Sequence, residues 1–116
     1  MSQFRILEID QLLSEYCHVT SNPRRSLLIR ILGDGERTVS ELVELTGFSA
    51  ANISQHLRLL RQKRIVAVQR DGAYSRYRLI APKLLQAMAL MREAFMECLD
   101  GEQRMFLMAQ EDSRHE

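Results

Sequence analysis

Apolar residues recur with helical spacing in the stretch 38–65, TVSELVELTGFSAANISQHLRLLRQKRI. Thr38 and Glu41 stand three residues apart, as in a capping box, and Gly47 stands where a helix would end. Between them, four apolar residues form a stripe that we expect to be buried: Val39, Leu42, Val43 and Leu45. The pattern predicts a first short helix.

A second helix is predicted after Ser49, a favourable N-cap residue. Its apolar side carries Ile53, Leu57 and Leu60. The other side carries small residues, amides and guanidinium groups, which suit a DNA major groove because Gln and Arg can bond adenine and guanine in two places. An ordinary solvated helix also has a polar outer face. The candidate DNA-binding residues here are Ser49, Asn52, Ser54, Gln55, His56, Arg58 and Arg61; a packed or hydrogen-bonding role is the alternative for His56.

Residues 66–80, VAVQRDGAYSRYRLI, contain two runs of β-forming residues around Asp71-Gly72. Glycine tolerates the positive φ of a tight turn, so this segment predicts a β-hairpin, or wing. Arg70 and Arg76 flank the turn and are candidates for contacts with phosphates or with a minor groove.

Charge is unevenly distributed along the chain. Residues 48–80 hold seven cationic residues against one acidic residue, a net charge of +6, although the whole chain carries only +1. Residues 84–116 carry −4. A concentrated basic segment is typical of a nucleic-acid footprint, and we expect the acidic end to stay away from DNA.

Two helices are predicted ahead of residue 38. In residues 3–19 the apolar positions recur at spacings of three and four: Ile6, Ile9, Leu13 and Tyr16. Asn22 followed by Pro23 begins the second helix, which we expect in the core. Arg24 and Arg25 at its start are candidates either for phosphate contact or for a solvated surface.

After the hairpin, Pro82 begins a helix whose apolar residues repeat as a heptad: Leu84, Met88, Met91, Phe95 and Cys98. Such a seam predicts pairing with a second copy, so we expect a homodimer formed through residues 1–20 and 82–100. Gly101 is expected to end this helix. Residues 101–116 are expected to form an extension, a short helix or turn followed by a frayed, polar end.

The stretch FSAANISQHLRLLRQKRIV followed by RDGAYSRYRL resembles the winged helix-turn-helix repressors of the ArsR/SmtB family, over about residues 20–99. The resemblance implies a fold that is mostly α with a small β-hairpin, a single domain over 1–116 with its helix-turn-helix at 38–65 and its wing at 66–80. It implies a homodimeric repressor that binds an inverted-repeat operator in double-stranded DNA. An inducer or a thiol-reactive signal would release it.

The resemblance does not extend to the metal sites of the family. The cysteine pair of its metal sensors would fall within residues 40–43, which hold none, and the three histidines lie in separate segments. We therefore predict no metal site and no cofactor. Cys17 and Cys98 are candidate thiol sensors, although a free cysteine is more often packed in a core as a small apolar residue. The inducer stays open.

The composition, with 46% hydrophobic and 27% charged residues, is ordinary for a soluble globular domain. Charged residues interrupt the first apolar positions, and no run of about eighteen apolar residues occurs, so we predict a cytoplasmic protein without a membrane segment. No set of nucleophile, base and orienting residue emerges, which favours a protein that is not an enzyme. The alternative function is a protein-interaction module on a winged-helix fold without specific DNA binding.

Overall fold

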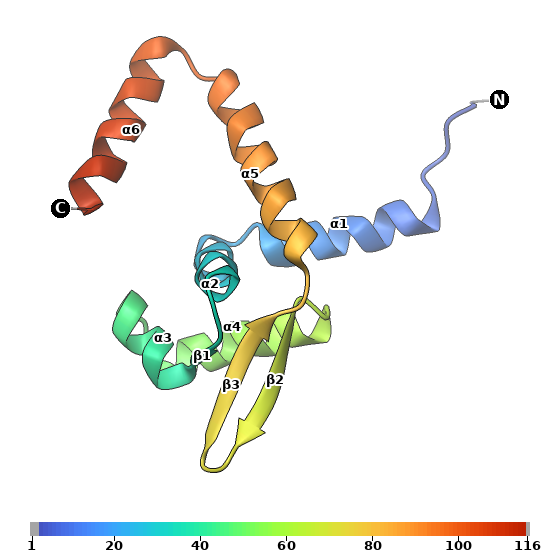
Figure 1. The fold of residues 1–116 in the computed structure, drawn as a ribbon. Coiled ribbons are helices and arrows are strands. Elements are labelled where there is room, and N and C mark those ends of the chain that lie inside the picture. The colour runs from blue at the N-terminus through green and yellow to red at the C-terminus, as the bar shows by residue number, and fades with distance from the viewer. Residues whose placement is uncertain (1–2, 116) are drawn as a thin grey trace. The chain divides into compact units, whose positions relative to one another are not determined.

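The computed structural model describes residues 3–115, and within them the chain forms helices and one small antiparallel sheet (Figure 1). The elements in chain order are α1 (Glu8–Thr20), α2 (Pro23–Gly33), β1 (Arg37–Thr38), α3 (Val39–Thr46), α4 (Ala50–Gln62), β2 (Val66–Asp71), β3 (Tyr74–Leu79), α5 (Pro82–Glu97) and α6 (Gly101–His115). This confirms the predicted fold class, a mostly α winged helix-turn-helix. One compact unit ends at Pro82 and another begins at Lys83; the single domain stays a prediction.

The helix-turn-helix forms where its local signals predict it. The Thr38 N–H donates to Glu41 Oε1 at 3.1 Å, and the Glu41 N–H donates to Thr38 Oγ1 at 3.2 Å, which completes the capping box of α3. Gly47 ends α3 with φ of 74°. The Ser49 hydroxyl oxygen accepts the Asn52 N–H at 3.1 Å and caps α4. The turn between the two helices is therefore fixed at both ends.

The core of the first unit is built from fully buried aliphatic side chains of α2, α3, α4 and the segment after α4: Leu28, Ile29, Leu42, Ile53, Leu57, Leu60 and Ile65. Burial of its whole apolar side anchors α4 and determines which side chains it turns outward. The predicted burial of Leu45 is wrong, because this side chain is 59% exposed. It lies in the last turn of the short α3, and Leu42 is the residue that α3 buries fully.

The wing is the β2–β3 hairpin, in a sheet of order β1-β3-β2. Asp71 pairs with Tyr74, so the two-residue turn is Gly72-Ala73, one position later than predicted. Gly72 has φ of 63°, which glycine adopts at little cost. β1 was not predicted; its two residues pair with Tyr77 and Arg76 and join the wing to the start of α3.

α1 begins later than predicted. Its first residue is Glu8, and the Asp10 carboxylate caps it by accepting the Leu7 N–H at 3.1 Å. Ile6 therefore precedes the helix, while Ile9 and Leu13 lie on it and are exposed. Burial of this apolar face by a second copy stays a prediction.

After α5 the extension forms one helix of 15 residues, α6, which is longer than the predicted short helix or turn with a frayed end. Gly101 begins α6 and does not end α5, because Asp100 caps α6: its Oδ1 accepts the Gln103 N–H at 2.8 Å. Arg104 donates to the carbonyl oxygens of Met96 and Leu99, both at 3.2 Å, at the end of α5. An ion pair between Arg92 and Glu111 also links α5 with α6. Among the described residues, no helix is long and apolar enough to cross a bilayer.

Candidate nucleic-acid interface

The outer face of α4 presents the polar side chains that the sequence places there. Exposed side chains on or beside this helix include five of the predicted contact residues: Ser49, Ser54, Gln55, Arg58 and Arg61. The other two, Asn52 and His56, are half-buried. Amide and guanidinium groups next to the small Ser54 side chain are the donors and acceptors that read base edges in a major groove.

His56 lies between α4 and the start of α2. Its Nδ1 is 3.4 Å from Arg25 Nη1, and because a guanidinium can only donate, Nδ1 acts as the acceptor. Burial lowers the pKa of His56, and the positive charges of Arg25 and Arg24 lower it further. Arg25 also donates to the Val19 carbonyl at 2.6 Å. His56 thus helps to join two helices, and its contact with DNA stays a prediction.

The basic hairpin projects from the first unit next to α4 (Figure 1). Arg70 is exposed on β2, and Arg76 is exposed on β3. Arg76 lies 3.9 Å from the Glu41 carboxylate and 3.8 Å from that of Asp71. Hydrogen bonds from Thr38, backbone first, lower the pKa of Glu41, and the charges of Arg76 and Arg37 add to this effect. Arg76 thus has two carboxylates near it in the free chain, both of them exposed to solvent, and its contact with DNA stays a prediction.

Arg24 reaches from the start of α2 to the start of α4. Its Nη1 donates to Asn52 Oδ1 at 2.8 Å, and its guanidinium carbon lies 4.3 Å from the centroid of the Phe48 ring. From the sequence, Arg24 was a candidate either for phosphate contact or for a solvated surface, and neither alternative included these two contacts. The pairing with Asn52 joins residues 28 positions apart and leaves no periodic signal in the sequence.

The two thiols are not packed in a core. Cys17 and Cys98 are both exposed in the single chain, so the expected packing role is wrong for the chain by itself. Cys98 follows the end of α5, where its Sγ lies 3.4 Å from the Ala94 carbonyl oxygen. Among the side chains that the structure describes, no group of three or more His, Cys, Asp or Glu is placed to hold a metal ion. The absence of a metal site stays a prediction.

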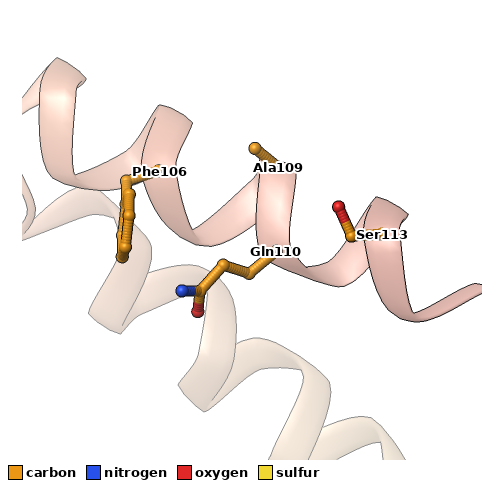
Figure 2. A pocket seen from close by; sticks show the side chains of 4 residues that line it. All are labelled: Phe106, Ala109, Gln110 and Ser113. Carbon is orange, nitrogen blue, oxygen red and sulfur yellow. The ribbon is translucent and has the colours of Figure 1, made fainter.

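A shallow hollow lies on α6, lined by Phe106, Ala109, Gln110 and Ser113 (Figure 2). Figure 2 shows Phe106 and Gln110 on one side of the helix and Ala109 and Ser113 on another, as four-residue spacing requires. The hollow is lined by an aromatic ring, an amide and a hydroxyl group, and by no group that ionises near neutral pH. It offers no acid, base or metal ligand.

Comparison with known proteins also indicates that the helix-turn-helix belongs to a transcriptional regulator. Residues 22–68 match the family model described as "Bacterial regulatory protein, arsR family". Over 90 residues the chain is 30% identical to the HTH-type transcriptional regulator Rv0081 of Mycobacterium tuberculosis, covering 77% of this chain and 79% of that protein. The crystal structure of Rv0081 superposes with a TM-score of 0.71 at 28% identity, over 79% of this chain and 93% of that one.

Two further similar proteins are described as repressors. A probable mercury resistance operon repressor of Streptomyces lividans is 30% identical over 102 residues, covering 78% of this chain and 82% of that protein. The crystal structure of the transcriptional repressor BigR from Xylella fastidiosa superposes with a TM-score of 0.62 at 30% identity, over 72% of this chain and 86% of that one.

Proposed function

Because this chain belongs to the arsR family of bacterial regulatory proteins, it is a DNA-binding transcriptional regulator, and we propose that it acts as a homodimeric repressor. Its proposed target is an inverted-repeat operator in double-stranded DNA. A small inducer or a thiol-reactive signal would release the dimer. We also propose that the chain is not an enzyme and that the dimer acts in the cytoplasm.

The exposed polar face of α4, next to a basic hairpin, is the observation that carries the proposal. Gln55 and Arg58 are exposed on α4, whose other side is fully buried, so their direction is set by the core. Arg70 and Arg76 lie on the adjacent hairpin. Base-reading groups on a helix and cations on a wing correspond to the two kinds of contact that DNA recognition requires.

Repression is supported by the descriptions of two similar proteins, the mercury resistance operon repressor and BigR. A repressor of this kind lowers transcription by occupying its operator, so an inducer acts by lowering the affinity of the protein for DNA. No side chain named above identifies the inducer.

Dimerisation is supported by exposed apolar residues on the two helices that the sequence assigns to it. On α1, Ile9, Leu12 and Leu13 are more than half exposed, and on α5 so are Met91 and Phe95. Apolar faces of this kind on a small protein mark an interaction surface. A twofold axis would place two copies of α4 about 34 Å apart, one turn of DNA, which matches an inverted repeat.

Replacing Gln55 or Arg58 with alanine should weaken discrimination between operator and random duplex by about 1–3 kcal/mol each, because each removes a base-edge contact. Competition gel shifts with operator and random DNA would measure this loss. Circular dichroism should show an unchanged fold, since both side chains are exposed.

Arg76→Ala is the comparison for Arg58→Ala: each variant loses one exposed arginine, the first from the wing and the second from α4. It should lower affinity for both duplexes alike and reduce the salt dependence of binding. The assignment of roles would be reversed if Arg76→Ala changed sequence preference while Gln55→Ala and Arg58→Ala did not.

Neither thiol is enclosed in the core of its own chain, and both lie on or next to the helices assigned to the dimer interface, which supports a thiol-reactive signal that acts there. Oxidant added to the protein–operator complex should release the DNA, and Cys17→Ser or Cys98→Ser should prevent release. A fluorescence anisotropy titration with and without oxidant measures this directly. Full release in both single variants and in the double variant would end the thiol proposal and leave a small-molecule inducer.

A further inference from the structure

The start of α2 carries two adjacent arginines, which is an unfavourable position for positive charge. The N-terminal end of a helix has a partial positive charge, and the first turn of α2 contains no acidic residue. Asn22 holds this turn in place, because its Oδ1 accepts the N–H groups of Arg24 and Arg25 at 3.0 and 3.2 Å. Arg25 is used in packing, through Val19 and His56. Arg24 is exposed, and its side chain makes a separate set of contacts.

The guanidinium of Arg24 is held in a defined place by two contacts. The Phe48 ring lies against it at 4.3 Å, and Asn52 Oδ1 accepts one of its N–H groups at 2.8 Å. A guanidinium has five N–H donors, so these contacts leave donors facing solvent. Among the described residues, no carboxylate lies within ion-pair distance of Arg24, whereas Arg76 has two such carboxylates nearby.

The contact with Arg24 also determines which part of the Asn52 amide is available. A guanidinium cannot accept a hydrogen bond, so the amide oxygen of Asn52 must face Arg24, and its NH2 group faces elsewhere. Paired recognition of adenine by asparagine uses both the oxygen and the NH2 group. With its oxygen engaged, Asn52 is left chiefly as a donor. The Arg24–Asn52 pair thus offers several donors and one positive charge.

We propose that Arg24, oriented by Phe48 and Asn52, is a contact for a DNA backbone phosphate at the N-terminal end of α4. A phosphate is an anion with acceptor oxygens only, and it matches a planar donor group of this kind. Arg24 belongs to α2 and meets α4 at Asn52, in its first turn, so the proposed contact would be with the DNA strand beside the bases that α4 reads. This inference rests on the proposed binding of operator DNA and adds a residue outside the helix-turn-helix and wing.

The test is a salt titration of DNA binding by Arg24→Ala, with Arg30→Ala as control. Arg30 is an exposed arginine on the same helix, six residues further on and so about 240° around the helix axis from Arg24. Its replacement by alanine removes the same charge from a different side of α2. Arg24→Ala should lower affinity about tenfold for operator and random duplex alike. It should also reduce the slope of log K against log[salt] by about 1. Arg30→Ala should change neither by a comparable amount.

Two more variants test the orientation of Arg24. Arg24→Lys should recover only part of the affinity, because an ammonium keeps the charge but lacks the planar donor group. The double variant Arg24→Ala with Asn52→Ala should lose little more than Arg24→Ala alone, since the two residues act together. Circular dichroism melting of each variant would report any loss of fold.

Binding of the wild-type protein to operator and to random DNA distinguishes failure of this inference from failure of the proposed function. If it does not prefer its operator over random DNA, the proposed function is wrong. If it does, and Arg24→Ala behaves like Arg30→Ala, only the phosphate contact is wrong. A loss confined to certain base sequences would also overturn it, because a phosphate contact carries no sequence information.

Discussion

Met91→Glu should convert the proposed homodimer into a monomer and lower operator affinity by about 10²- to 10⁴-fold. The side chain is 71% exposed on α5 and lies in the middle of the heptad seam, so a carboxylate there would be buried without a partner when two copies meet. Loss of the second copy removes the gain in affinity that comes from holding two half-sites at once. Sedimentation velocity and gel shifts on the same preparation would measure both effects.

Gln86→Glu is the matched control for this variant. Gln86 is exposed on α5, five residues before Met91 and about 140° around the helix, so it adds the same charge away from the seam. It should leave the dimer and operator binding intact. A dimeric Met91→Glu protein with normal affinity would mean that α5 does not form the interface.

Leu57→Ala should lower the free energy of unfolding by about 2–5 kcal/mol. Leu57 is fully buried on the inner side of α4, so truncation removes apolar contacts and leaves a cavity between α4 and its neighbours. Urea denaturation followed by circular dichroism gives the value, at one protein concentration because a dimer is stabilised by mass action.

Leu59→Ala makes the same chemical change two residues further along α4, where the side chain is 37% exposed. Its effect on the free energy of unfolding should be clearly smaller, because surrounding water already reaches this side chain. Equal losses in the two variants would contradict the assignment of the inner and outer faces of α4, on which the choice of DNA-reading residues depends.

The helix-turn-helix could be predicted because its signals are local. The reciprocal bonds of Thr38 and Glu41, the αL conformation of Gly47 and the cap at Ser49 each depend on residues within four positions of one another. The apolar spacing of Ile53, Leu57 and Leu60 then identified the buried side of α4. The outward direction of Gln55 and Arg58 follows from that spacing, whereas the half-buried positions of Asn52 and His56 depend on α2.

Contacts between distant segments could not be predicted in the same way. β1 has two residues and forms only because β3 is available to pair with it. The Arg24–Asn52 bond and the approach of Arg76 to Glu41 require the folded arrangement of α2, α3, α4 and β3. No pattern of spacing along one element contains such information.

The predicted end of the helix that follows the wing was wrong, because a glycine such as Gly101 does not by itself end a helix. A signal for α6 was present in the sequence: Asp100 and Gln103 have capping-box spacing, and the structure shows both of their hydrogen bonds. The apolar residues of α1 and α5 illustrate a different limit. Helical spacing predicts that one face is apolar, but it does not identify the surface that covers that face.

Selection of binding sites from random duplexes by the purified wild-type protein, at near-physiological salt, would show whether two copies of α4 bind one operator. We expect enrichment of an inverted repeat whose half-sites lie about 10 base pairs apart, centre to centre, bound by two chains per duplex. Enrichment of a single unrepeated site, or no enrichment in the presence of competitor DNA, would contradict a dimer that presents α4 and its wing twice to one operator.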